Sequence, residues 1–472
     1  KIVKQVMLGN QWEFELKPSL DNRWGDFQLP AKNELLGAQI RQLHFVPNKN
    51  YSGEKLLFDS SWKTVTCAFG PQFLKLGALP VLPSETELQK ISLQKAGDEM
   101  QIAGKKYRWE EYAFSWQQGV EGDYGHQGYH GLKGQMYDNF IRLGALTEEK
   151  MSLFRTAEMT GNYYVLLTNV VAPDDNTFDL LTGEVKPAIL LVNNQKIDSK
   201  ASTVLLKKGL NSVLAVYDRA CETYFVFRKQ GITRPEKQPV SMCWYGDSGV
   251  LPFDYTSGEE NGLFAFDSAP GLRSLKFQAY GKIEAWADGV KQEIKTTEQQ
   301  PSDGLTNYQV DFQFPKLNTT QVVLKVNFQP GRYGAASFPK YFEQDCGKGV
   351  INVGDWSKID GLKAYSGGMW YRQKIQIENT DLENKLEIDL GNVVSSAEMW
   401  VNGKSAGIRL SPPWKFDITS LAKVGENQID VLIYNTVANN YTSVPTRYPG
   451  KITSGLLGPV KLNVIGQVPL HQ

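Results

Sequence analysis

The residues best suited to chemistry gather in a glycine-rich segment at 119–131. This segment holds two of the four histidines in the chain beside two carboxylates: Glu121, Asp123, His126 and His130. On a helix, the His-x-x-x-His spacing would place both imidazoles on one face, as metal ligation requires. The glycines between 119 and 131 disfavour a helix, so we predict no metal site from this spacing.

Carboxylates suggest a second chemistry for the same part of the chain. Glycoside hydrolysis uses two carboxyl groups held about 5–9 Å apart, which Glu110, Glu111, Glu121 and Asp123 could supply. A chain with 51 acidic residues yields such clusters easily, so we predict no catalytic residue. We favour an ordered loop whose Tyr and His rings dock against a neighbouring domain. The alternative is a contribution to a site that another domain completes.

Sugar recognition requires aromatic rings for the apolar side of a pyranose and polar groups for its hydroxyls. The last part of the chain offers Trp370, Tyr371, Arg409, Trp414, Tyr434 and Asn435. Trp414 follows Pro412-Pro413, a pair that stiffens a loop, and we weigh a sugar-facing and a core position for it equally. Trp400 lies inside a predicted strand and is assigned to the core. Arg409, Trp414 and Asn435 join the four residues at 121–130 as predicted substrate-binding or domain-docking residues.

Other site classes find no support in the sequence. The chain has no Gly-x-Ser-x-Gly, P-loop or dinucleotide-binding motif, which disfavours esterase-like, NTPase and Rossmann functions. Its four cysteines are widely spaced, which disfavours a zinc cluster. We predict no cofactor. Calcium is the one ion that the run Asp174–Asn176 with Asp179 could bind, but a solvated turn is favoured because EF-hand spacing is absent.

Charge and hydropathy exclude two classes of partner. The 51 basic and 51 acidic residues give a formal net charge of zero, so nothing attracts a nucleic-acid backbone or an anionic membrane broadly. No apolar run approaches the ~18–20 residues that span a bilayer. The chain opens at Lys1 rather than Met, from which we expect a fragment of a longer protein or a chain whose leader has been removed.

The elements that must position these residues are strands arranged in a repeat. The clearest copy has an apolar strand at 397–401, the turn Asn402-Gly403, and Gly425-Glu-Asn427 leading into a second alternating strand. An Asn-Gly pair between apolar runs is a strong hairpin signal, because both turn residues take positive φ. We expect the unit to be a duplicated module, with unrelated hairpins as the alternative.

Two further copies precede it. One has the strand 188–192, the pair Asn193-Asn194 and the element 208–211, with the sequence Lys-Gly-Leu-Asn. The other has the strand 283–286 and the turn Asp288-Gly289 but lacks the Gly-x-Asn element, so it is the weakest match. Strands without long alternating helices argue against a parallel α/β sheet or barrel. We therefore predict an all-β chain of tandem antiparallel β-sandwich or jelly-roll domains.

Breaks in the repeat set the predicted domain boundaries. The segment 229–242 is rich in Pro, Lys and Gln without alternation and indicates a linker, and the Gly-rich segment 329–349 indicates a second connection. The prediction is a long first sandwich region at 1–235, which one sandwich or two subdomains would both fit. A second sandwich follows at 243–345, and a galactose-binding-like jelly roll at 346–472.

The last domain resembles a known module. The segments Trp400-Val-Asn-Gly403, Pro412-Pro-Trp-Lys-Phe-Asp-Ile-Thr419, Gly425-Glu-Asn427 and Tyr434-Asn-Thr436 resemble the galactose-binding-like jelly roll of family 2 glycosidases. Several elements arrive in order at the right spacing over roughly the last 125 residues. The resemblance implies a module that folds and orients sugar-processing enzymes and in some of them binds sugar.

The front half resembles a narrower family. Its segments Trp12-Glu-Phe-Glu-Leu16, Asp21-Asn-Arg-Trp-Gly-Asp-Phe27, Gly119-Val-Glu-Gly-Asp123 and the run 125–133 look like the region after the barrel in α-L-rhamnosidases of glycoside hydrolase family 106. That family attacks terminal α-linked rhamnose in pectin-like glycans by inversion, with paired Glu residues and calcium in its barrel. None of those barrel motifs matches here, so no catalytic residue is carried over. The resemblance implies export by bacteria that degrade plant glycans, to the periplasm or the exterior.

These inferences predict an accessory, sugar-recognition part of a rhamnosidase-like glycoside hydrolase. Its expected partners are a rhamnose-containing glycan and the catalytic domain of the same parent protein, and this chain alone is expected to be non-catalytic. Two alternatives stay open: a free-standing carbohydrate-binding protein, and a complete hydrolase with its site built on the sandwiches. An immunoglobulin-like protein-interaction array is less consistent with the Asp-Ile-Thr and Gly-Glu-Asn signature.

Overall fold

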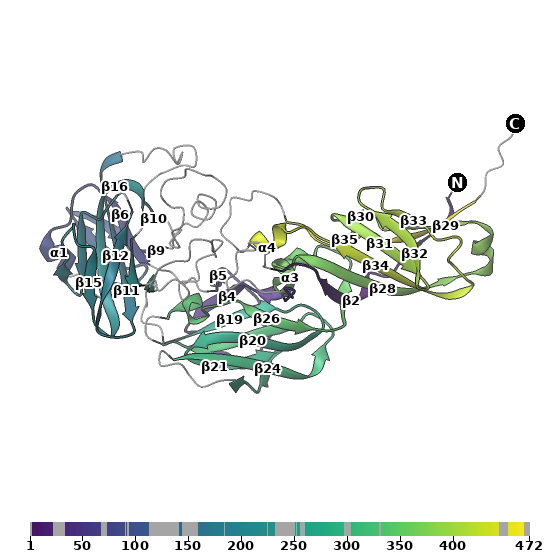
Figure 1. The fold of residues 1–472 in the computed structure, drawn as a ribbon, viewed down its shortest axis with the longest axis horizontal. Helices are drawn as coiled ribbons and strands as arrows, with labels where there is room; N and C mark the ends of the chain where they lie inside the picture. The colour runs from purple at the N-terminus through teal and green to yellow at the C-terminus, as the bar shows by residue number, and fades with distance from the viewer. Residues whose placement is uncertain are drawn as a thin grey trace.

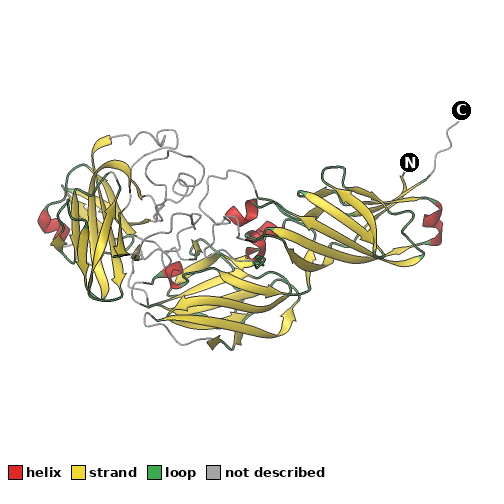
Figure 2. Ribbon diagram, in the orientation of Figure 1, coloured by secondary structure: helices red, strands yellow, loops and turns green. Residues whose placement is uncertain are grey.

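The computed structural model confirms the predicted all-β class, with strands in antiparallel sheets and a few short helices (Figure 2). It describes residues 2–21, 34–67, 73–89, 91, 94–112, 141–143, 159–183, 185–223, 225–231, 251, 253–254, 260–296, 304–329, 332–442 and 452–466. Within these ranges no helix is both long and apolar enough to cross a membrane. The strands form three sandwiches, with the middle one drawn between the other two (Figure 1).

The first sandwich comprises residues 73–254. Its larger sheet has the strand order β14-β13-β16-β11-β6-β9, with β10 paired to β16 and β18 to β11, and faces the smaller sheet β15-β12-β17. Its elements are β6 (Phe73–Leu79), α1 (Glu85–Gln89), β7 (Glu99–Ile102), β8 (Lys105–Arg108), β9 (Glu110–Tyr112), β10 (Ile141–Leu143), β11 (Met159–Ala172), β12 (Asn176–Thr182), β13 (Ile189–Val192), β14 (Gln195–Lys196), β15 (Thr203–Leu206), β16 (Gly209–Thr223), β17 (Phe225–Lys229) and β18 (Phe253–Asp254).

The middle sandwich joins residues 38–67 to residues 260–346. Its sheets have the orders β22-β21-β25-β19-β4-β5 and β23-β24-β20-β26-β3. Its elements are β3 (Gln39–Ile40), β4 (Gln42–Pro47), β5 (Lys63–Thr66), β19 (Asn261–Asp267), β20 (Leu272–Tyr280), β21 (Lys282–Ala287), β22 (Val290–Gln292), β23 (Lys295–Thr296), β24 (Leu305–Lys316), β25 (Gln321–Asn327), η2 (Gly334–Ser337) and β26 (Phe342–Cys346).

The C-terminal sandwich joins residues 2–18 to residues 349–465. Its sheets have the orders β27-β2-β28-β34-β31-β32 and β1-β36-β29-β33. Its elements are β1 (Ile2–Met7), β2 (Gln11–Pro18), β27 (Gly349–Asn352), η3 (Trp356–Lys358), α3 (Asp360–Lys363), β28 (Gly367–Ile377), η4 (Asn379–Glu383), β29 (Lys385–Asp389), β30 (Asn392–Val393), β31 (Ser396–Val401), β32 (Lys404–Arg409), β33 (Lys415–Asp417), β34 (Gly425–Tyr434), α4 (Ala438–Thr442), β35 (Leu456–Gly458) and β36 (Lys461–Ile465).

Strand pairing divides the chain differently from the predicted boundaries. Strand β2 pairs with β28 in the C-terminal sandwich, and β4 pairs with β19 in the middle sandwich. The predicted first region at 1–235 is therefore not continuous, because its first 66 residues supply strands to the other two sandwiches. The predicted connection at 329–349 includes β26, which pairs with β20. Local alternation identifies a strand but does not specify a partner hundreds of residues away.

The repeat recognised in the sequence corresponds to a sheet with the same strand arrangement in each of the three sandwiches. The orders β14-β13-β16-β11-β6-β9, β22-β21-β25-β19-β4-β5 and β32-β31-β34-β28-β2-β27 place the repeated hairpin at the same edge, followed by the same succession of central strands. In each case the first strand of the hairpin also pairs, on its other side, with a later central strand, which is β16, β25 or β34. We infer that the three sandwiches are copies of one module.

A pair of asparagines fixes the hairpin in two of the copies. In the first sandwich, Asn193 Nδ2 donates to Asn211 Oδ1 (2.8 Å), and Asn211 Nδ2 donates to the Lys207 carbonyl (2.7 Å). In the C-terminal sandwich, Asn402 Nδ2 donates to Asn427 Oδ1 (2.8 Å), and Asn427 Nδ2 donates to the carbonyl four residues before it (2.7 Å). Asn211 and Asn427 are both fully buried, so these bonds satisfy groups that water cannot reach.

The middle copy keeps the turn without the second asparagine. Asp288 Oδ1 accepts a hydrogen bond from the Gln321 backbone N–H (3.0 Å), as Asn193 and Asn402 do from their partner strands. Asp288 and Gly289 have φ values of 48° and 79°, the left-handed pair that a tight hairpin turn demands. The weak sequence match at this copy thus still forms the same hairpin.

Candidate functional site

The predicted residues of the glycine-rich segment, Glu121, Asp123, His126 and His130, lie outside the described residues. Of the other two carboxylates proposed there, Glu110 lies 3.8 Å from Lys75, and Glu111 forms an ion pair with Lys63 of β5. Both sit on β9, where successive side chains point to opposite faces. Glu110 and Glu111 therefore do not face each other as a catalytic pair.

The acidic run considered for calcium is already occupied by protein groups. The Lys208 backbone N–H donates to Asp175 Oδ1 (2.7 Å) and lowers the pKa of that carboxyl. Asp179 forms an ion pair with Arg228 at 3.1 Å. These two carboxylates bind separate partners, and the described residues include no group of three or more His, Cys, Asp or Glu that could hold a metal ion.

Trp414 lies in the core of the C-terminal sandwich, with 6% of its surface exposed. It directly precedes β33, two residues before Phe416, and both side chains belong to the core between the two sheets. The sugar-facing alternative for Trp414 is therefore wrong. Tyr371 is also buried, and its hydroxyl accepts a hydrogen bond from the Leu456 N–H (3.3 Å).

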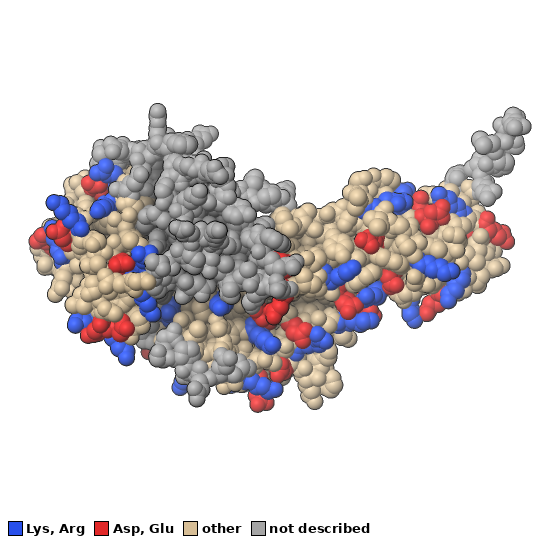
Figure 3. All heavy atoms as spheres, viewed as in Figure 1, with Lys and Arg blue, Asp and Glu red and all other residues tan. Residues whose placement is uncertain are grey.

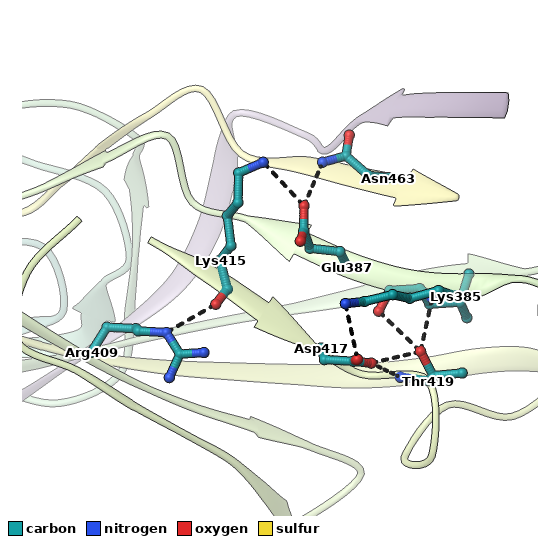
Figure 4. Close-up of polar contacts among 8 residues, drawn as sticks. Lys385, Glu387, Arg409, Lys415, Asp417, Thr419 and Asn463 are labelled. Carbon is teal, nitrogen blue, oxygen red and sulfur yellow. Dashed lines mark hydrogen bonds and ion pairs between the residues drawn. The ribbon is translucent and has the colours of Figure 1, made fainter. Parts of the chain in front are cut away.

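Arg409 and Asn435 are held by the sandwich itself. Arg409 Nε donates to the Lys415 carbonyl (3.1 Å), as Figure 4 shows, and its guanidinium lies 5.1 Å from the ring centre of Phe416. Asn435 Oδ1 accepts from the Gly367 N–H (2.8 Å), and its Nδ2 donates to the Tyr365 carbonyl (2.8 Å). The structure thus does not bring Arg409, Trp414 and Asn435 together into one site.

The aromatic residues that do gather lie on the outer face of the six-stranded sheet in the C-terminal sandwich. Alternation turns Met369 and Tyr371 of β28 into the core, so Trp370 points outward. Trp400 points outward from β31 for the same reason, and the ring centres of Trp370 and Trp400 are 5.1 Å apart. The assignment of Trp400 to the core was therefore wrong.

Tyr434 and Leu432 of β34 complete this surface. Leu432 pairs with Trp370 across the sheet and is only 1% exposed, although it points away from the core. A Cβ at Gly368 would lie 2.9 Å from the Tyr434 ring, so glycine there leaves room for that ring. We call the set Trp370, Trp400, Leu432 and Tyr434 the outer aromatic face.

Charged side chains border the outer aromatic face. Arg372 lies 5.2 Å from the ring centre of Trp370 and binds Glu15 at 2.7 Å, with Glu13 at 3.4 Å and Asp430 at 3.8 Å. Aromatic rings beside carboxylates and a guanidinium are the groups that bind a pyranose and its hydroxyls. Figure 3 shows charges of both signs interspersed over the C-terminal sandwich on the side in view.

The equivalent outer faces of the other two sandwiches are covered. In the first, Leu191 and Leu214 occupy the positions of Trp400 and Asp430 and lie under an apolar layer that includes Leu88 and Trp109. In the middle sandwich, the equivalent pair is Trp286 and Val323, and its covering layer is contributed by Tyr51, Leu56, Phe58 and Trp62. No described segment forms a comparable layer over the outer aromatic face.

Two open cavities elsewhere among the described residues lack an exposed aromatic ring against which a sugar could stack. One of about 520 Å³ opens at the edge of the first sandwich, between β12 and the β13–β14 hairpin, and no aromatic residue lines it. Another of about 350 Å³ lies where β27 meets η3, and its only aromatic residue, Trp356, is 1% exposed. Among the described residues, the outer aromatic face is thus the best candidate for sugar contact.

A titratable cluster marks the junction between the middle and C-terminal sandwiches. His44 Nε2 of β4 lies 3.4 Å from Asp360 Oδ2 of α3, and the Phe58 ring stacks on the imidazole at 3.8 Å. Asp360 Oδ2 also accepts from the Asp267 backbone N–H (3.0 Å). Burial, followed by the nearby Asp360 charge, raises the pKa of Asp267. These contacts join the sandwiches, and we assign them a structural role.

Part of this chain is similar in sequence to two proteins named as glycoside hydrolases. A putative β-glucuronidase of Formosa agariphila is 31% identical to it over 153 residues, a match that covers 23% of this chain and 13% of that protein. A second putative β-glucuronidase of that organism is 32% identical, over 19% of this chain and 9% of that protein. This chain thus spans a small fraction of the relatives' length. No protein-family model matches it.

Solved structures resemble the chain only distantly. A rhamnosidase from Novosphingobium sp. PP1Y is 18% identical with a TM-score of 0.23, over 44% of this chain and 23% of that chain. A β-glucuronidase from an uncultured Clostridium sp. is 16% identical with a TM-score of 0.20, over 42% of this chain and 30% of that chain. The chain is thus a β-sandwich protein related in part to glycoside hydrolases. The comparisons do not distinguish a rhamnosidase from a β-glucuronidase relationship.

Sequence reasoning missed Trp400 although a signal for it was present. Ala397, Met399 and Val401 alternate along the strand and form its core face, which leaves Trp400 on the opposite face. The same rule places Trp370 opposite Met369 and Tyr371. Membership of a strand alone does not bury a tryptophan, because only one set of alternate residues faces the core.

Proposed function

We propose that this chain is a sugar-recognition β-sandwich portion of a glycoside hydrolase, with the outer aromatic face as its glycan-contacting surface. The observation that carries the proposal is a sheet face that holds Trp370, Trp400 and Tyr434 beside Arg372 and that no described segment covers, while the equivalent faces of both sister sandwiches are covered. The partial match to putative β-glucuronidases supports the enzyme class. Catalysis is assigned to a part of the parent protein outside this chain.

The remaining expectations extend the same proposal. Rhamnose-containing plant glycans as substrate, and a periplasmic or extracellular bacterial setting, are supported by the motif resemblance to family 106 rhamnosidases. The proposed partner within the parent protein is its catalytic domain. The described carboxylates Glu110 and Glu111 point to opposite faces of β9, which favours an accessory function over a hydrolase site at that strand.

Binding measurements with the full chain test the proposal. Isothermal titration with a panel of plant oligosaccharides, including rhamnose-rich pectin fragments, should detect at least one ligand. Trp370→Ala should weaken that binding at least tenfold, equivalent to about 1.4 kcal/mol, because the stacking surface is removed. Phe314→Ala is the matched control: Phe314 is 73% exposed on β24 of the middle sandwich, and its loss should leave binding unchanged.

Three results would contradict the proposal. They are no binding across the panel, equal binding by wild type and Trp370→Ala, and release of free sugar from α-L-rhamnosides or β-glucuronides by this chain alone. The last result would place a catalytic site inside these residues, and the accessory function would then be wrong.

A further inference from the structure

One cation on the outer aromatic face has no carboxylate partner among the residues that the structure describes. Lys17 projects from the end of β2, and its Nζ lies 5.6 Å from the ring centre of Trp370 and 5.8 Å from that of Tyr434. Both rings attract the ammonium group through their negative π-faces. The interaction holds a positive charge between the two aromatic side chains against which a sugar would stack.

The other cations directed outward from this sheet are neutralised by neighbours. Arg372 binds Glu15 at 2.7 Å, and Lys374 binds Glu426 at 2.9 Å. Lys17 forms no ion pair with any described carboxylate. Lys17 therefore differs from the other cations of this sheet face, because its ammonium group contacts aromatic rings in place of a carboxylate. Its charge remains available to an anion.

We propose that the outer aromatic face recognises glycans that carry a carboxylate, with a uronic acid ring against Trp370 and Tyr434 and its carboxylate on Lys17 Nζ. This inference rests on the proposed function and adds the class of sugar to it. A charge-assisted hydrogen bond between an ammonium and a carboxylate is about twice as strong as a neutral one. Because the rings hold the ammonium in place before binding, little ordering of the lysine opposes the contact.

The carboxylates near Lys17 are paired with other cations. Glu15 is the nearest carboxylate in the sheet register, opposite Trp370, and it is paired with Arg372. Glu13 is paired with both Arg372 and Lys348, the latter at 3.0 Å. Arg372 and Lys348 together offset two of the three negative charges of Glu13, Glu15 and Asp430, so one net negative charge remains in this cluster.

Acid and ester forms of the same oligosaccharide isolate the carboxylate. We would titrate the full chain at low ionic strength with oligogalacturonate and oligoglucuronate, each beside its fully methyl-esterified form, which has the same rings without the charge. At least one acid form should bind at least tenfold more tightly than its own ester. Added salt should reduce this difference, because screening weakens an exposed ion pair.

Two lysine variants then locate the effect. Lys17→Gln should abolish the preference for the acid form, because the affinity for the acid should fall to that for the ester while the aromatic rings remain. Lys374→Gln is the matched control on the same sheet face, and the preference should survive in it. Circular dichroism should confirm that both variants keep the fold of the wild type, as expected for exposed side chains.

The outcomes separate this inference from the proposed function. Equal binding of acid and ester, or an acid preference that survives Lys17→Gln, would overturn the carboxylate assignment while sugar recognition stands. Tighter binding of sulfated than of carboxylated oligosaccharides would overturn it as well. No binding of any glycan, or concentration-dependent self-association that Trp370→Ala abolishes, would overturn both, because the face would then bind another copy of the chain.

Discussion

At the scale of single residues, one buried asparagine in each of two sandwiches ties the hairpin turn to the strand beside it. Asn211 and Asn427 each accept from one backbone N–H and donate to two carbonyls, and each also receives the side-chain amide of the hairpin asparagine. Both side chains are fully buried, so each bond replaces one that water would make in the unfolded chain. The Gly-x-Asn element was visible in the sequence, but its bonds to the hairpin were not.

Removing one of these amides should destabilise its own sandwich. Asn427→Ala leaves the Lys423 N–H and the Lys423 and Gly425 carbonyls without their side-chain partner, and should lower the free energy of unfolding by about 3 kcal/mol. Urea unfolding followed by tryptophan fluorescence measures the loss. Asn384→Ala removes a single side-chain bond to Thr380 and should cost less than 1 kcal/mol. Equal losses of unfolding free energy in the two variants would show that the buried hydrogen bonds of Asn427 stabilise the fold no more than one exposed bond does.

Asp267 gives the junction a specific pH dependence. Burial and the Asp360 charge raise the pKa of Asp267 above its ordinary value of 3.8, so the folded chain resists losing this proton. The stability that this group contributes is complete below its unfolded pKa and is lost as pH rises through the folded one. Asp267→Asn should therefore gain stability relative to wild type as pH rises from about 4 to 7. Denaturant unfolding at several pH values measures the difference in unfolding free energy between Asp267→Asn and wild type. If that difference did not change with pH, the raised pKa of Asp267 would be refuted.

At the scale of elements, the sequence predicted strands and turns well and faces less well. The hairpins at Asn193, Asp288 and Asn402 were located from turn chemistry and alternation, and the structure contains all three. Trp400 was expected in the core and lies on the outer face, and Trp414, for which both positions were weighed equally, lies in the core. A tryptophan is compatible with both a core and a ligand surface. Only the parity of the neighbouring apolar residues decides which face of the strand it takes.

Two tryptophan variants should separate stability from binding. Trp414→Ala removes a buried indole and should cost about 3–5 kcal/mol of unfolding free energy, while the protein that remains folded keeps its glycan affinity. Trp370→Ala should do the reverse, with weaker binding and a much smaller loss of stability. Thermal unfolding and calorimetric titration of both variants test this crossed pattern. If Trp414→Ala lost affinity while folded, the core position of that ring would not be its whole role.

At the scale of the molecule, the chain passes from the C-terminal sandwich to the middle one and then to the first before returning. Residues 2–18 and 38–67 are committed to sheets whose other strands arrive about 200 residues or more later. No local pattern encodes such pairing, which explains why the predicted boundaries treated residues 1–235 as continuous. The arrangement also means that the middle and C-terminal sandwiches share a junction that the chain crosses twice.

The fit of α3 against the middle sandwich should be the most sensitive point of that junction. Gln344 Oε1 accepts from the Ala269 N–H (2.9 Å), and its Nε2 donates to the Gly361 carbonyl (2.9 Å), so one buried amide bridges both sandwiches. A Cβ at Gly361 would overlap the backbone of Ser268 and Ala269, which cannot move aside as a flexible side chain would. Gly361→Ala should therefore separate α3 from the middle sandwich and break the Gln344 bridge.

The expected result is an increase in the radius of gyration by small-angle X-ray scattering and faster proteolysis between the two sandwiches, while each sandwich keeps its strands by circular dichroism. Gly37→Ala is the matched control, because the nearest atom to its Cβ, the Gln344 carbonyl oxygen, would lie at an ordinary contact distance of 3.9 Å. An unchanged scattering profile and digestion rate in Gly361→Ala would show that the junction tolerates the methyl group. The close backbone contact would then not be what joins the two sandwiches.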